Sequence, residues 1–167
     1  KRILKKTNFN SYHYSIPSEV IIEAYKKGLF PMAETLDTLG CEKAWLVHGS
    51  DGTDELTIVG SSSVVELVDG KISSFEIHPE DAGLPTHKLS EILGGSPDEN
   101  AAELKGLLEG KKNAYRDAVL LNSAAALIIA GKCDSLIEGV EHSVESIESG
   151  KAKEALEIVK KVSKGEL

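Results

Sequence analysis

The spacing of apolar residues predicts strands in the first half of the chain and helices in the second. Residues 44–47 form an unbroken apolar run, which is typical of a strand covered on both faces. Turn residues at positions 48–53 end this strand, and residues 56–59 are predicted to form a second strand. The intervening loop therefore lies where a strand ends, a common position for ligands when strands are parallel.

A β-hairpin is predicted after these strands. β-Rich runs at residues 64–68 and 71–77 flank Asp69-Gly70, and this dipeptide is a strong signal for a tight turn between antiparallel strands. Helical spacing then dominates. The predicted helices cover residues 19–29, 31–39, 97–108, 114–130, 134/135–149 and 152–162.

Three of these helices carry more specific predictions. Ser96, Pro97 and Glu99 form a capping-box pattern at the start of one helix. Residues 114–130 are the most apolar helical stretch and should form the central core helix, in which Arg116 and Asn122 would make core or helix-end hydrogen bonds. The helix at 31–39 should present Met32, Leu36 and Leu39 on one face and end at Gly40.

Composition limits the classes of partner. The 167 residues suffice for one domain with its own core, and 41% are hydrophobic and 28% charged, as in ordinary globular chains. The net charge of −8 argues against a nucleic-acid surface. There is no apolar run of transmembrane length and no signal-peptide pattern, so no membrane contact is expected. Cys41 and Cys133 lack metal-like spacing and read as free thiols in a reducing cytoplasm.

Candidate chemistry is concentrated at Asp54 and Glu55, which stand together in the loop between the first two predicted strands. Adjacent loop carboxylates are hard oxygen ligands, and Mg²⁺ commonly takes one or two of them together with substrate phosphates. An ordinary acidic turn is the alternative. His48 lies nearby and would either orient a phosphate or hydrogen-bond the loop backbone.

The other histidines carry less chemistry. His78, Glu80 and Asp81 could form a metal or acid–base site, but Pro79 and the turn residues after it favour a structural loop. His13, His87 and His142 have no polar companions in sequence and are read as surface residues.

Five ordered segments resemble anthranilate phosphoribosyltransferase, from about residue 31 to the C-terminus. They are the strand and acidic loop, residues 78–84, 99–102 and 116–122, and residues 130–132 with 135–136. In that family, the Asp-Glu pair after a His-Gly loop binds the Mg²⁺ that carries the pyrophosphate of phosphoribosyl pyrophosphate. The resemblance therefore implies a Mg²⁺ site at Asp54 and Glu55 and binding of that substrate.

The resemblance also has gaps. The family chain is about twice as long, and its N-terminal half supplies a helical domain, a Gly-Thr-Gly-Gly-Asp phosphate loop, a Lys-His-Gly-Asn-Arg segment and the anthranilate contacts. Neither motif occurs in these 167 residues. The strands-then-helices order alone suggests an α+β fold. The resemblance implies instead an α/β fold: part of a phosphoribosyltransferase domain, with a small sheet and its hairpin packed against C-terminal helices.

The first part of the chain has a different resemblance. Residues 16–34 are similar to the start of leucyl/phenylalanyl-tRNA–protein transferase. This predicts a chimera of a 1–30 arm and helix of different origin with a truncated phosphoribosyltransferase-like domain at 31–167. The arm is too short to bring the transferase's catalytic domain.

Three functions are compatible with these residues. The chain could be a truncated relative of the enzyme, with a weak or vestigial Mg²⁺ site and no complete active site. It could be a non-catalytic fold that self-associates as a homo-oligomer, since a partial domain leaves apolar surface uncovered. It could also be a half-enzyme completed by a separate polypeptide.

Overall fold

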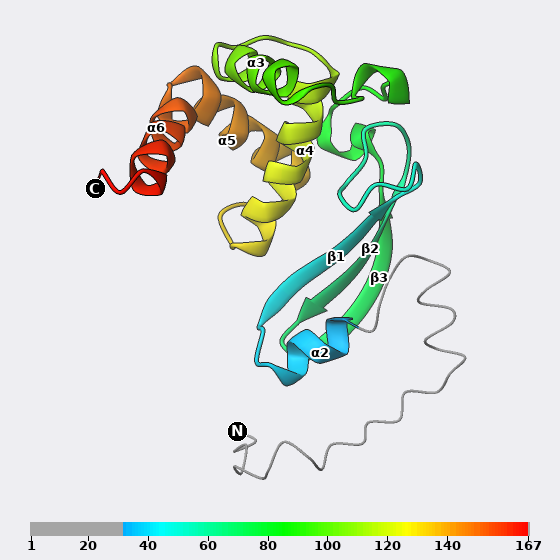
Figure 1. Cartoon of the computed structure of the whole chain (residues 1–167). Coiled ribbons are helices and arrows are strands. Elements are labelled where there is room, and N and C mark those ends of the chain that lie inside the picture. The colour runs from blue at the N-terminus through cyan, green and yellow to red at the C-terminus, as the bar shows by residue number, and fades with distance from the viewer. Residues whose placement is uncertain (1–31, 167) are drawn as a thin grey trace.

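The computed structural model describes residues 32–166, which form a small sheet with helices to one side of it (Figure 1). The predicted helix at 19–29 and the whole 1–30 arm lie outside these residues. The chain begins with helix α2 (Met32–Thr38), followed by strands β1 (Lys43–Gly49), β2 (Ser62–Val68) and β3 (Lys71–Ile77). Two 3-10 turns follow, η1 (Pro79–Ala82) and η2 (Leu89–Glu91). The last four helices are α3 (Pro97–Leu108), α4 (Ala114–Ile129), α5 (Leu136–Glu148) and α6 (Lys151–Ser163).

The sheet has the order β1-β2-β3 and is antiparallel throughout. Trp45 of β1 pairs with Glu66 of β2, and its indole N–H donates to the Glu66 carboxylate at 2.9 Å. The predicted hairpin is confirmed: Asp69 and Gly70 both have positive φ, as a tight turn between twisted strands requires. Because β1 is antiparallel to β2, the expectation of a loop at the end of a parallel strand is not met within residues 32–166.

The predicted strand at residues 56–59 does not form. Leu56, Thr57 and Ile58 are buried but irregular, because side chains and a distant loop take their backbone hydrogen bonds. The Thr57 N–H donates to the Ser62 hydroxyl, and the Ile58 carbonyl accepts from the His87 N–H. Both edges of β2 are already paired, one with β1 and the other with β3, so this segment finds no free edge of β2 and becomes a buried connection.

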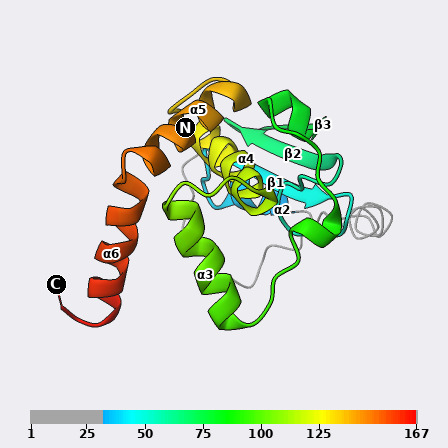
Figure 2. The same ribbon diagram turned by 90° about the horizontal axis from the view of Figure 1, so that it is seen from above.

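Helix α4 is the central core helix, as its apolar composition predicts. Among the last four helices, Figure 2 shows α4 nearest the sheet and α6 farthest from it. The amine of Lys43, at the start of β1, donates to the Ile128 carbonyl at the C-terminal end of α4 at 2.7 Å, where a cation is favourable. The core lies where α4 meets the irregular segment and the sheet. Its members include Leu56, Ile58, Val64, Ile77, Leu120 and Leu121.

The helix boundaries follow their predicted caps, with one error in the buried face. Ser96 accepts from the Glu99 N–H and begins α3, and Ser135 accepts from the Glu138 N–H and begins α5. In α2, however, Ala33 is the buried residue, while Met32 and Leu39 are exposed. The helix is only seven residues long, so it contacts β1 and β2 through a small surface and buries no apolar stripe.

Candidate functional site

The acidic loop leaves β1 at Gly49 and returns to β2 at Ser62 (Figure 1). Asp54 and Glu55 lie at its exposed turn. Within residues 32–166, no ion pair or side-chain hydrogen bond occupies either carboxylate. The two side chains are therefore free to bind a cation from solvent, which is the state that a Mg²⁺ ligand requires before binding.

Asp51 holds the loop from inside. Its carboxylate accepts from the Thr53 N–H at 3.2 Å and from the Thr57 hydroxyl at 2.8 Å. The Gly49 N–H donates to the Thr53 carbonyl at 3.0 Å, which closes the turn. A Cβ at Gly49 would lie 2.6 Å from the Asp51 carboxylate and 2.9 Å from the Thr57 Cβ. Only glycine therefore fits after His48.

Asn122 fixes the far side of the loop from α4. Its Oδ1 accepts from the Leu56 N–H at 2.9 Å, and its Nδ2 donates to the Leu56 carbonyl at 2.9 Å. Leu56 itself is buried in the core. Asn122 thus binds both backbone polar groups of Leu56, the residue directly after Glu55. The two carboxylates therefore extend from a backbone that is anchored at one end. The predicted core hydrogen bonding of Asn122 is confirmed.

His48 lies near the end of β1, paired across the sheet with Ser63, and is half-buried. No hydrogen bond or ion pair joins its ring to Asp54 or Glu55 in the described part of the chain. The structure thus brings Asp54 and Glu55 together at the loop tip and leaves His48 at the strand that supports it.

The second group of polar residues, around His78, is a structural loop as predicted. The Asp81 carboxylate accepts from the His78 N–H at 2.8 Å and caps η1. The Thr86 hydroxyl donates to the Glu80 carboxylate, and this hydrogen bond is the main cause of a lowered pKa at Glu80. Both carboxylates are thus engaged locally.

His87 lies deeper than its sequence pattern indicates, whereas Arg116 makes the buried hydrogen bonds that were predicted for it. His87 is not an isolated surface residue: its Nε2 lies 2.8 Å from the Asp117 carboxylate, and its side chain is only 17% exposed. Arg116 is 4% exposed, with its guanidinium 3.3 Å from Glu148 and 3.4 Å from the Gly110 carbonyl. Its Nε has no partner among residues 32–166. The pairing of His87 with Asp117 is tertiary, and no local pattern could have shown it.

The two cysteines are free, as predicted. Burial, followed by the nearby Glu138 carboxylate, raises the pKa of the Cys133 thiol above its ordinary value. The thiol therefore stays protonated at neutral pH and is a poor nucleophile or metal ligand.

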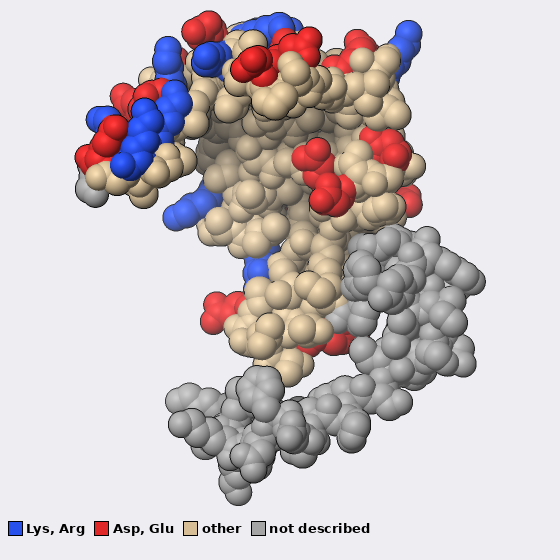
Figure 3. Space-filling model, in the orientation of Figure 1, with Lys and Arg blue, Asp and Glu red and all other residues tan. Residues whose placement is uncertain are grey.

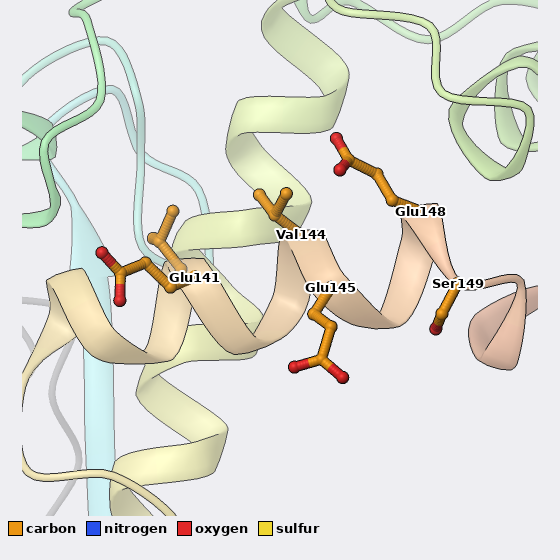
Figure 4. A pocket seen from close by; sticks show the side chains of 6 residues that line it. Glu141, Val144, Glu145, Glu148 and Ser149 are labelled. Carbon is orange, nitrogen blue, oxygen red and sulfur yellow. The ribbon is translucent and has the colours of Figure 1, made fainter.

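An open surface groove lies elsewhere. It has a volume of about 380 Å³ and is formed along α5 by Val140, Glu141, Val144, Glu145, Glu148 and Ser149 (Figure 4). None of the acidic-loop residues lines it.

Among residues 32–166 no group of three or more His, Cys, Asp or Glu side chains could hold a metal ion by itself. Any ion at Asp54 and Glu55 therefore needs further ligands from a substrate or from water. No helix in the described region is both long and apolar enough to cross a bilayer.

The fold and loop define a class of protein. Residues 13–153 match the model of the glycosyl transferase family, a/b domain, and the chain belongs to this family. It is 53% identical over 126 residues to anthranilate phosphoribosyltransferase from Parvibaculum lavamentivorans, and 52% identical over 122 residues to the enzyme from Rhodopseudomonas palustris. These alignments cover 75% and 73% of this chain but 37% and 36% of the relatives.

Solved structures agree. The anthranilate phosphoribosyltransferase of Thermus thermophilus matches with a TM-score of 0.68 at 43% identity, over 76% of this chain and 37% of that one. The Saccharomyces cerevisiae enzyme in complex with PRPP and Mg matches with a TM-score of 0.69 at 28% identity, over 75% and 37%. The chain thus spans little more than a third of the length of these relatives and folds like the corresponding part of their α/β domain.

The family match bears on the predicted chimera. It begins at residue 13 and includes the whole segment at residues 16–34 that resembles leucyl/phenylalanyl-tRNA–protein transferase. No comparison supports that second resemblance.

Proposed function

We propose that Asp54 and Glu55 bind Mg²⁺ together with the pyrophosphate group of phosphoribosyl pyrophosphate. The observation that carries this proposal is a pair of adjacent, exposed carboxylates without partners among residues 32–166, on a loop held by Asp51 and Asn122. Mg²⁺ prefers one or two carboxylates and keeps its other positions for water and phosphate oxygens. The donor set therefore fits this ion better than one that requires a closed protein site.

The chain's own residues would position this ion and its ligand. Asp51 and Asn122 hold the loop before any ligand arrives, so little ordering cost remains at binding. His48 is proposed to orient a phosphate or to hydrogen-bond the loop backbone. When bound, Mg²⁺ supplies neutralisation of the charge that develops on departing pyrophosphate.

We propose binding without turnover for the chain alone. The relatives transfer the phosphoribosyl group to anthranilate, the reaction that gives them their name, but the phosphate-loop and acceptor motifs expected for that reaction do not occur in these 167 residues. A Mg²⁺ site by itself supplies only part of the positioning that such a transfer needs.

A second candidate is a half-enzyme that a separate polypeptide completes. β3 supports this alternative, because six of its seven residues are exposed, including the large apolar side chains of Ile72 and Phe75. Within residues 32–166, this strand has one unpaired edge and an apolar face that an added partner could cover.

Calorimetric titration of phosphoribosyl pyrophosphate into the 167-residue chain tests the binding proposal. We expect binding with Mg²⁺ present, none after EDTA, and none in Asp54→Asn. Glu154→Gln is the matched control, because it removes an exposed carboxylate on α6, which contributes nothing to the acidic loop, and should leave binding unchanged. Equal binding in EDTA, or no binding at millimolar ligand, would contradict a magnesium-dependent site.

Two further proposals concern origin and location. The different origin of residues 1–30 stays a prediction, against which the family match from residue 13 counts. A cytoplasmic location is proposed from the free thiols of Cys41 and Cys133, since disulfides are rare in that compartment.

A further inference from the structure

The acidic loop needs support from the rest of the chain before any cation arrives. Asp51, Asp54 and Glu55 follow one another closely in this loop. Figure 3 shows acidic side chains on the part of the surface where the loop lies in Figure 1, without Lys or Arg side chains among them. Neighbouring carboxylates repel one another. The backbone beside the acid pair must therefore be held by contacts from outside the loop.

His87 supplies one of these contacts, to the segment that follows the acid pair. Its backbone N–H donates to the Ile58 carbonyl at 2.8 Å. Ile58 belongs to the irregular buried segment after Glu55, and Asn122 of α4 already binds Leu56 in the same segment. The chain between the acid pair and β2 is thus bonded at two points by residues from later in the sequence.

The ring of His87 joins this contact to α4. Its Nε2 lies 2.8 Å from the carboxylate of Asp117, in the first turn of α4, and its Nδ1 lies 3.9 Å from the carboxylate of Glu91 in η2. A carboxylate only accepts, so Nε2–H donates to Asp117 in a charge-assisted hydrogen bond. The two side chains are 17% and 20% exposed, so water competes little for this bond. His87 therefore connects the segment at Ile58 to the helix that also carries Asn122.

We propose that His87 is a positioning residue for the Mg²⁺ site and acts through Asp117. The proposal rests on the function proposed above for Asp54 and Glu55. Together with Asn122, His87 fixes the segment after the acid pair against α4, so the two carboxylates keep their position relative to that helix. No hydrogen bond or ion pair joins His87 to either carboxylate within residues 32–166. Loss of such an outer partner weakens metal binding even when every ligand remains.

Two amide variants separate the contact made by the ring from the bulk of the ring. Glutamine carries an N–H donor at a reach similar to that of the imidazole Nε2, whereas asparagine carries the same group one methylene shorter. His87→Gln should therefore keep the bond to Asp117, and His87→Asn should lose it. Asp117→Ala removes the acceptor. If His87 acts through Asp117, the variant with both His87→Asn and Asp117→Ala should lose no more than either single variant.

Amide hydrogen exchange, followed by NMR, tests the anchor without any ligand. We expect the Leu56 and Thr57 amides to exchange about tenfold faster in His87→Asn than in the wild type, because a hydrogen bond to a charged group no longer restrains the segment. His87→Gln should restore most of the protection. Gly70→Ala is the matched control. It strains the hairpin turn, where φ is +76°, at the opposite end of β2 from the loop, so it lowers overall stability without touching the loop.

Titration of phosphoribosyl pyrophosphate with Mg²⁺ present measures the effect on the site. We expect the dissociation constant to rise about tenfold in His87→Asn and in Asp117→Ala, and to stay within about twofold of the wild-type value in His87→Gln and Gly70→Ala. His87→Asn with wild-type exchange and binding, His87→Gln without rescue, or an equal loss in Gly70→Ala would overturn the proposal. If the wild type itself does not bind, the Mg²⁺ site is contradicted, and the exchange rates alone decide whether His87 anchors the loop.

Discussion

Asn122 is the residue on which the loop geometry depends most. It satisfies both backbone polar groups of buried Leu56. Asn122→Ala leaves that N–H and carbonyl without partners in the core, so we expect the free energy of unfolding to fall by about 2–4 kcal/mol. Urea denaturation followed by circular dichroism measures the change.

Asn100 supplies a matched control for Asn122. It makes the same two-point contact with the backbone of Gly95, accepting from its N–H at 2.8 Å and donating to its carbonyl at 3.2 Å, but at the exposed start of α3. Water replaces these bonds in Asn100→Ala, so we expect a loss below about 1 kcal/mol. Equal losses in the two variants would show that burial of Leu56 does not matter.

The acidic pair should matter little for folding. Asp54 and Glu55 are exposed and make no side-chain contact with a partner in residues 32–166, so Asp54→Asn combined with Glu55→Gln should change stability by no more than about 0.5 kcal/mol. Thermal unfolding in metal-free buffer measures this. A large loss of stability would mean that the two carboxylates themselves stabilise the loop. That result would contradict the structure, in which neither carboxylate has a partner among residues 32–166.

The sequence alone predicts the exposure and hydrogen bonding of some residues but not of others. The exposed carboxylates at Asp54 and Glu55 and the buried bonds of Asn122 follow from local pattern, because a turn exposes its acids and a polar residue in an apolar helix needs partners. The His87–Asp117 pair does not follow, because its members lie 30 residues apart and neither sits in an informative motif.

Among the elements, α4 and α5 make the closest helix contact. A Cβ added to Gly139 of α5 would lie 2.7 Å from the backbone Cα of Ala124 in α4. Gly139→Ala should therefore force the helices apart and lower stability by about 1–2 kcal/mol, even after the gain in helix propensity. Differential scanning calorimetry would record the lower melting temperature.

Gly106 of α3 is the counterpart in which the same change should help. Its added Cβ would meet only the flexible side chain of Lys111, at 3.2 Å. Gly106→Ala should thus raise stability by up to about 1 kcal/mol, through propensity alone. If Gly139→Ala were also stabilising, the close approach of α4 and α5 would not be limiting.

The sequence predicts best those elements whose start or end is marked by a turn or capping motif. The Asp69-Gly70 hairpin and the Ser96 cap of α3 are confirmed because turn and capping chemistry acts within four residues. The strand at 56–59 fails because its β-rich residues bond to Asn122, Ser62 and His87 instead of a neighbouring strand. Propensity indicates what a segment prefers, whereas tertiary partners decide where its hydrogen bonds go.

At the scale of the whole molecule, the chain is a partial α/β domain with apolar side chains exposed on two of its elements. It spans 37% of the length of the Parvibaculum lavamentivorans relative, and it exposes apolar residues on β3 and α6. The resemblance of ordered segments predicts this fold class. Amphipathic spacing predicted α6 with an apolar face but could not show that this face lies in solvent, because exposure depends on where the helix points.

The clamp between Asn122 and Leu56 also has a kinetic meaning. Its two hydrogen bonds join positions 66 residues apart, with the hairpin and α3 between them. Closing so long a loop costs chain entropy before the contact returns any energy, so this contact belongs to the late stages of folding. Asp54 and Glu55 are adjacent in the sequence, but their position in the fold is fixed only when α4 packs against the loop. The acidic loop is therefore a product of the completed fold and cannot act as its nucleus.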